Sequence, residues 1–169
     1  MTKPNERVGL DITSVKVPNN IMATVTEPHW RIIVDEKTGM KFSDFYKTKN
    51  QIGESTAERF YSWKANGIPV TYLRMDNAGE NKALQARVNS VDWKLNIKVE
   101  YTAPNTPQEN SLAESEFRTQ YCNGRAMAFA AHLPVKVRLT LVKEYMTCAT
   151  MLIWLQVIEI DGIIKTRYE

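Results

Sequence analysis

The chain has 169 residues and a mass of 19.4 kDa, which is enough for one domain with its own core but not for two large lobes. Hydrophobic residues make up 43% of it and charged residues 24%, as in an ordinary soluble globular domain, which argues against a disordered chain and against a membrane-embedded protein. A net charge of +3 allows nucleic acid as a partner without arguing for it, because nucleic-acid-binding proteins are recognised by how their basic residues cluster.

Cysteine usage and the N-terminus indicate a soluble protein inside the cell. The two cysteines, Cys122 and Cys148, stand far apart, which argues against a secreted disulfide framework. The N-terminus has neither the apolar core of a signal peptide nor the composition of a transit peptide. The longest apolar stretch, around residues 151–158, is far below the roughly 20 residues that span a bilayer. We therefore expect no membrane partner and, with only two histidines at no recognised ligand spacing, no structural zinc.

The first part of the chain predicts three antiparallel strands and a helix. Apolar positions in residues 8–12, 29–35 and 40–46 are typical of strands, and residues 36–39 form a turn between the second and the third. Residues 52–66 then change to helical spacing, with apolar side chains on one face.

The second part alternates short strands with helices. Residues 69–75 and 97–101 are predicted strands, and residues 80–88 are a predicted helix between them. A helix starts at Thr106, which is followed by Pro and, three residues after the cap, by Glu. A last helix is expected over residues 135–155. This order predicts an α/β fold around a mixed sheet.

Three acidic residues occupy positions that structure alone would not favour. Asp11 lies within the first strand, Asp76 directly follows the fourth, and Glu114 lies on the helix that starts at Thr106. Functional groups of α/β sheets gather at strand ends, so these carboxylates are expected to meet there. Because converging carboxylates repel one another, they are expected to bind Mg²⁺ or Mn²⁺, for which carboxylate oxygens are suitable ligands. Two such ions can clamp the attacking and leaving oxygens of a phosphodiester.

Each of these acids also has a purely structural interpretation. Asp76 with the three residues after it could form an ordinary tight turn, Glu114 could lie on a solvated helix face, and Asp11 could end its strand early. Spacing alone does not decide between the two interpretations.

Two segments carry a resemblance to a known family. They are Asp76-Asn77-Ala78-Gly79-Glu80-Asn81 and Tyr101-Thr102-Ala103-Pro104-Asn105-Thr106-Pro107-Gln108-Glu109-Asn110-Ser111-Leu112-Ala113-Glu114-Ser115. Both resemble the integrase core of copia-type long-terminal-repeat retrotransposons and, more distantly, of retroviruses. The family has an Asp in its first strand, where this chain has Asp11. The resemblance spans roughly residues 7–152.

The resemblance implies a ribonuclease H-like fold, with a five-stranded mixed sheet flanked by helices. It implies a catalytic core over residues 7–155, an N-terminal tail over 1–6 and an unassigned tail over 156–169. The implied catalytic and metal-binding triad is Asp11, Asp76 and Glu114, with two Mg²⁺ or Mn²⁺ ions. The implied reaction is metal-dependent cleavage at element DNA ends, followed by strand transfer into target DNA by a homo-oligomer. If functional, the protein is expected in the nucleus.

Further residues are candidates for binding DNA. Asn110 and Arg118 lie one turn before and one turn after Glu114, on the same helix face, where they could orient substrate or contact phosphate. A cluster of lysines in and after the predicted second hairpin could follow a DNA backbone, although such lysines also keep edge strands soluble. The cluster comprises Lys37, Lys41, Lys47 and Lys49.

Two departures from the family pattern leave a second function open. Ser111 and Ser115 stand where the family usually has Gly and Arg, and the second difference removes a positive charge beside the triad. The alternative to an integrase is a degenerate or domesticated, non-catalytic domain that binds nucleic acid or protein. The enzymatic assignment, a polynucleotidyl transferase of the D, D, E type, therefore rests on ancestry.

Overall fold

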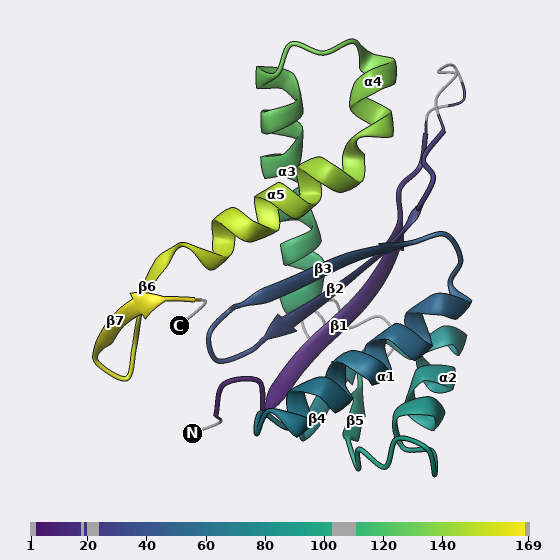
Figure 1. Cartoon of the computed structure of the whole chain (residues 1–169), viewed down its shortest axis with the longest axis vertical. Coiled ribbons are helices and arrows are strands. Elements are labelled where there is room, and N and C mark those ends of the chain that lie inside the picture. The colour runs from purple at the N-terminus through teal and green to yellow at the C-terminus, as the bar shows by residue number, and fades with distance from the viewer. Residues whose placement is uncertain (1–2, 18, 20–23, 103–110, 168–169) are drawn as a thin grey trace.

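A five-stranded mixed sheet forms the centre of the molecule in the computed structural model, which describes residues 3–17, 19, 24–102 and 111–167 (Figure 1). The strands stand in the order β3-β2-β1-β4-β5. The three N-terminal strands pair antiparallel, whereas β4 and β5 run parallel to β1. Their bounds are β1 Arg7–Ser14, β2 His29–Asp35, β3 Lys41–Tyr46, β4 Tyr72–Met75 and β5 Lys98–Tyr101.

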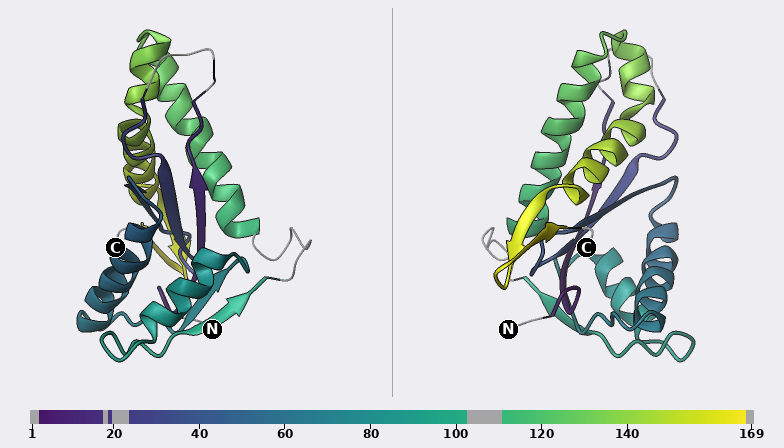
Figure 2. Two further views of the ribbon diagram at one scale, coloured as in Figure 1. Left: turned by 90° about the vertical axis from the view of Figure 1, so that its right-hand side faces the viewer. Right: turned by 60° about the vertical axis from the view of Figure 1, so that its left-hand side comes forward.

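Helices surround this sheet in two groups. Helices α1 and α2 pack against each other at one end of the molecule, and α3, α4 and α5 rise at the other (Figures 1 and 2). A separate hairpin, β6–β7, follows α5. None of the helices in the described ranges is both long and apolar enough to span a bilayer. The bounds are α1 Asn50–Ala65, α2 Gly79–Val88, α3 Ser111–Ala130, α4 Val135–Thr140, α5 Val142–Trp154, β6 Val157–Ile160 and β7 Ile163–Thr166.

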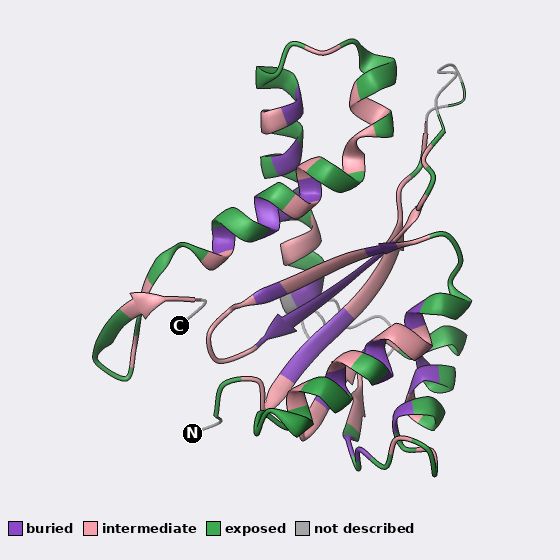
Figure 3. Ribbon diagram, in the orientation of Figure 1, coloured by how far each residue is buried: buried purple, intermediate pink, exposed green. Residues whose placement is uncertain are grey.

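The two faces of the sheet bury separate apolar clusters, because successive side chains of a strand point to opposite faces. Leu10, Ile33 and Leu73 pack with Phe60 of α1 on one face. On the other face, Ile32 packs with the first turn of α3, and Trp30 packs with Met146 of α5. The buried residues accordingly follow the central strands and the inner sides of the helices (Figure 3).

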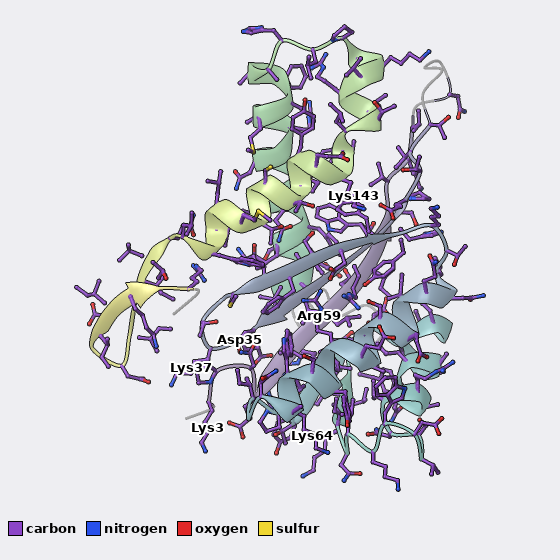
Figure 4. All side chains as sticks on the ribbon, in the orientation of Figure 1. Lys3, Asp35, Lys37, Arg59, Lys64 and Lys143 are labelled. Atoms are coloured by element: carbon purple, nitrogen blue, oxygen red, sulfur yellow. The ribbon has the colours of Figure 1, made fainter. Side chains whose placement is uncertain are left out.

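A charged cluster is buried on the α1 face of the sheet. Arg31 of β2 is fully buried, and its guanidinium donates to Asp44 of β3 at 2.5 Å and to Thr56 of α1 at 2.5 Å. Arg59 of α1 lies between its helix and the sheet and donates to the other oxygen of Asp44 at 2.8 Å (Figure 4). We refer to Arg31, Asp44 and Arg59 as the arginine cluster. It joins β2, β3 and α1, so its charges serve the fold.

The predicted elements are present, and their ends differ by a few residues at most in the described ranges. The last helix is the exception: the single helix expected over 135–155 is two helices, which meet at Leu141. The break redirects the chain so that α5 buries Met146, Ala149, Thr150 and Ile153, whereas α4 buries none of its residues. The tail at 156–169, which matched no pattern, contains the β6–β7 hairpin.

Candidate active site

The register of β1 and β4 brings two of the predicted carboxylates level with each other. These parallel strands pair from Arg7 with Tyr72 to Gly9 with Arg74, an offset of 65 residues. The pairing ends there, but the same offset continued two residues further corresponds to Asp11 and Asp76, and the charge of Asp76 acts on the Asp11 carboxyl. The side chains of Leu10 and Leu73 lie on the face covered by α1. Because successive side chains of a strand point to opposite faces, Asp11 lies on the other face, toward α3.

The first turn of α3 carries the third carboxylate to this face. Ala113 is fully buried over β1, where a β-carbon added to Gly9 would lie 3.9 Å from the β-carbon of Ala113. Glu114 is the next residue and is exposed. Gly9 and Asp11 lie on the same side of β1, so the helix that covers Gly9 holds Glu114 near Asp11. A small residue at position 9 allows this close approach.

The pKa of the Asp11 carboxyl reflects its burial and the charges of the other two acids. Burial raises the pKa of its carboxyl from the ordinary 3.8 to about 6. A hydrogen bond from the backbone N–H of Ile12, at 2.8 Å, opposes this rise, and the negative charges of Asp76 and Glu114 add to it. None of the ion pairs among the described residues involves these three carboxylates. Their like charges are therefore not neutralised within the described chain.

Asp76 is held in place by a residue whose role the sequence analysis missed. Asn81 is buried in the first turns of α2, and its side-chain amide donates to the Asp76 carboxylate at 2.5 Å. The backbone N–H of Ala78 donates to the same oxygen at 3.1 Å. Asn81 belongs to the Asp76–Asn81 segment that carries the family resemblance, so the signal for it was present in the sequence.

The donor set of these acids fits a hard divalent cation, because carboxylate oxygens are its preferred ligands and mutual repulsion favours binding positive charge. However, among residues 3–17, 19, 24–102 and 111–167 no three His, Cys, Asp or Glu side chains are arranged to hold a metal ion. The three carboxylates therefore share one face and one electrostatic field without forming a closed coordination shell. Metal coordination by Asp11, Asp76 and Glu114 stays a prediction.

A hollow beside α3 is lined by two basic side chains among mostly apolar ones, and we call it the basic hollow. Arg118 is exposed one turn after Glu114. It lines a hollow of about 410 Å³ together with Ser14 of β1 and Lys16 beyond that strand. Trp30 also lines this hollow. Lys16 was not among the predicted DNA contacts, because only the fold brings the end of β1 beside α3.

The predicted lysine cluster is divided by the fold. Lys41 is only 6% exposed, and its ammonium pairs with Glu116 at 2.5 Å, so its charge serves packing inside the protein. Lys37 lies at the turn between β2 and β3, at the end of the sheet far from Ser14 (Figure 4). Its ammonium pairs with Asp161 at 2.6 Å.

The two remaining lysines are exposed near the start of α1. Lys49 pairs with Glu80 at 2.5 Å, whereas Lys47 forms no ion pair with the described residues. Lys47 directly follows the last residue of β3. Asn110 lies outside the described residues. Of the predicted cluster, Lys47 and Lys49 thus remain at the surface at the end of the sheet away from Lys37.

Comparison with solved structures identifies the fold. The chain is similar to a chain of the simian T-cell lymphotropic virus intasome, solved in complex with PP2A regulatory subunit B56 gamma, with 19% identity and a TM-score of 0.68. The match covers 98% of this chain and 53% of that one, so the present chain spans about half of it. The chain has a retroviral-integrase catalytic-core fold.

Two catalytic cores match over nearly their full length. The HTLV-2 integrase catalytic core domain, solved in complex with magnesium in a dimeric form, is 15% identical with a TM-score of 0.62. The match covers 98% of this chain and 94% of that domain. The BIV integrase catalytic core domain is 15% identical with a TM-score of 0.61, covering 97% of this chain and 91% of that core. No protein-family model matches the sequence, and no curated protein sequence matches it.

These comparisons confirm the predicted ribonuclease H-like fold and its five-stranded mixed sheet. The assignment to copia-type elements goes beyond the fold and stays a prediction.

Proposed function

We propose that this chain is the catalytic core of a copia-type retrotransposon integrase, which cleaves phosphodiesters at DNA ends and transfers the strands to target DNA. One observation carries the proposal: the charges of Asp76, at the end of β4, and of Glu114, at the start of α3, both act on the partly buried Asp11 carboxyl of β1, and none of the three acids has an ion-pair partner among the described residues. A structural cluster of acids would be expected to carry paired cations, as the arginine cluster does.

Asp11, Asp76 and Glu114 would hold Mg²⁺ or Mn²⁺, in the two-ion arrangement that the family resemblance implies. Bound there, the ions would supply positive charge to the phosphodiester oxygens and to the attacking oxygen. The chain's own contribution is positioning: Asn81 fixes one oxygen of Asp76, and the backbone N–H of Ile12 fixes one oxygen of Asp11. The hydrogen bond from Ile12 favours the ionised form of Asp11, which is the form that binds a cation.

The basic hollow beside this site supports DNA as the substrate. Arg118 and Lys16 line it from two elements that meet next to the carboxylates. Their positive charges would attract phosphates and so bring a DNA backbone to Glu114. Lys47 and Lys49 lie at the same end of the sheet and are candidates for contacting the DNA further away.

Oligomerisation and location follow from the same proposal. The HTLV-2 core is dimeric in its solved form, and we propose a homo-oligomer for this chain when it is active. Integration into a chromosome would place its action in the nucleus.

A non-catalytic nucleic-acid-binding domain is the second candidate. One observation favours it: the carboxylates of the described residues do not form an arrangement that could hold a metal ion. In this case the basic hollow would bind DNA, and the acids would have no catalytic role.

A strand-transfer assay separates the two candidates. The purified chain is incubated with a DNA duplex bearing a free 3′-hydroxyl and a supercoiled plasmid, with Mg²⁺, with Mn²⁺ or with a chelator. Metal-dependent joining or nicking is expected for the wild type and for Asp92→Asn, an exposed control. Asp76→Asn is expected to lose it by at least about a hundredfold, the scale of removing one electrostatic catalytic group. Equal activity in wild type and Asp76→Asn, or DNA binding without any activity, would favour the second candidate.

A further inference from the structure

A second hollow lies further along α3. Helix α4 folds back beside this part of α3 (Figure 1). Its volume is about 350 Å³. The floor is aliphatic and comes from three helices: Ala128 from α3, Leu139 from α4, and Val142 and Met146 from α5. We call this hollow the α3–α5 groove. Val142, Leu139 and Tyr121 line both this groove and the basic hollow, so the two are neighbours.

Close packing of α3 on α5 shapes the floor of this groove. A β-carbon added to Gly124 would lie 2.7 Å from the sulfur of Met146, which is closer than such contacts allow. The glycine therefore lets Met146 rest against the backbone of α3. The groove is part of a packed helical layer, and its floor exists without a ligand.

The rim of the groove is aromatic and cationic. Tyr121 and Phe129 are 46% and 53% exposed there. The guanidinium of Arg125 lies 5.7 and 5.6 Å from the centroids of these two rings, and that of Arg138 lies 4.2 Å from the centroid of Phe129. No lining residue is acidic, and neither arginine takes part in an ion pair among the described residues. Both guanidiniums are thus held in place by rings, with their charges not neutralised there.

Helix α4, which forms one wall, has an unusually exposed apolar surface. It buries none of its residues, and Val135 and Val137 are 47% and 38% exposed. An aliphatic hollow flanked by fixed cations is complementary to a segment that carries apolar and acidic side chains together.

We propose that the α3–α5 groove docks an acidic amphipathic segment of a partner protein. One or two large apolar side chains of this segment fill the hollow over Leu139 and Val142, and its carboxylates pair with Arg125 and Arg138. This interaction is separate from the proposed catalytic function, because it uses none of the three acids.

The chemistry of the groove favours a peptide over nucleic acid. The aliphatic floor offers no hydrogen-bond partner to the edges of bases. Both rings at the rim already carry guanidiniums, so a base that stacked there would have to compete with Arg125 and Arg138. Apolar side chains of a peptide need neither a hydrogen-bond partner nor a free aromatic face.

A binding measurement with defined probes tests the proposal. The probe is a short fluorescein-labelled helical peptide with leucines at i and i+4 surrounded by glutamates. Matched peptides replace the glutamates by lysine or the leucines by alanine, and a single-stranded oligonucleotide serves as the nucleic-acid probe. Arg125→Gln and Arg138→Gln should each weaken binding of the acidic peptide by about tenfold, the scale of one charge-assisted hydrogen bond. Arg87→Gln, an exposed arginine on α2, is the matched control and should bind like the wild type.

Methyl NMR on the unaltered chain provides a readout that does not depend on any variant folding. The acidic peptide should shift the methyl signals of Leu139 and Val142, and Asp76→Asn should leave both the shifts and the affinity unchanged. Equal binding of the lysine peptide, unchanged binding by both arginine variants, or no methyl shift would overturn the proposal. If only the oligonucleotide binds and the arginine variants lose it, the groove is a nucleic-acid surface instead.

Discussion

The two faces of the sheet differ in how their charged side chains are paired. On the α1 face, the single carboxylate of Asp44 lies between the guanidiniums of Arg31 and Arg59, and Thr56 takes a further hydrogen bond. On the α3 face, Asp11 is also largely buried, but the charges that it experiences most are those of Asp76 and Glu114. In the arginine cluster every charged group has a partner of opposite charge, whereas the three acids have none among the described residues.

This difference distinguishes charges that are paired within the fold from charges that are not. Opposite charges in the arginine cluster hold β2, β3 and α1 together, and losing one partner leaves the other buried and unpaired. Like charges around Asp11 make the folded state less stable unless something positive binds. Such a cluster persists in a fold only because the surrounding packing holds it, which is the usual condition of a site that binds a cation.

The same chemical change in the two clusters should affect stability in opposite directions, and the larger effect is expected in the arginine cluster. Asp44→Asn removes the charge that two guanidiniums share, one of them fully buried. The free energy of unfolding should fall by about 3 kcal/mol, measured by urea denaturation.

An exposed ion pair is the control for this substitution. Glu54→Gln breaks the pair with Arg87 at the surface between α1 and α2 and should cost less than about 1 kcal/mol. An equally small effect of Asp44→Asn would mean that the arginine cluster does not stabilise the fold.

Asp11→Asn should stabilise the metal-free protein at neutral pH. The pKa of Asp11 is about 6 in the folded chain against 3.8 ordinarily, so ionisation above pH 6 costs the folded state about 3 kcal/mol relative to the unfolded state. The variant removes this cost, and its free energy of unfolding should exceed that of the wild type by about 2 to 3 kcal/mol at pH 7.5.

The difference in stability between the wild type and Asp11→Asn should depend on pH. Below pH 3.8 the carboxyl is protonated in both states and contributes nothing. As pH rises from 3.8 to about 6, the unfolded state loses the proton first, so the stability of the wild type falls relative to that of Asp11→Asn. Urea midpoints of both proteins at several pH values measure the difference. A difference that does not change across this window would contradict the raised pKa.

Divalent metal should produce the smallest of these effects, and only on the α3 face. Mg²⁺ or Mn²⁺ at about ten times its dissociation constant should stabilise the wild type by about 1.4 kcal/mol, which raises the melting temperature by about 3 to 6 °C. Asp44→Asn should keep this response, whereas Asp11→Asn and Asp76→Asn should lose it. Thermal unfolding at matched ionic strength, with NaCl in the reference sample, measures it. A similar rise of the melting temperature in the wild type and all three variants would show that the metal binds elsewhere.

Periodicity predicted the strands, the first helices and hence the α/β fold, because apolar alternation is a local property of the sequence. The motif around Asp76 and Glu114 led to the integrase-like fold that the comparisons confirm. Periodicity did not predict the break at Leu141, since both sides of it have helical spacing. Nor could it show that Lys41 is buried against Glu116, because a lysine on an edge strand is usually solvated.

The sequence by itself determined the order of the elements and the identity of the three acids. Only the tertiary structure decided which charges act on one another: β1 pairs in parallel with β4, and Ala113 of α3 packs over Gly9 of β1, so the charges of Asp76 and Glu114 act on Asp11. Tertiary structure also created the α3–α5 groove, whose arginines lie on two different helices. Local propensity acts over a few residues, whereas register, burial and electrostatic fields depend on segments that lie far apart in the chain.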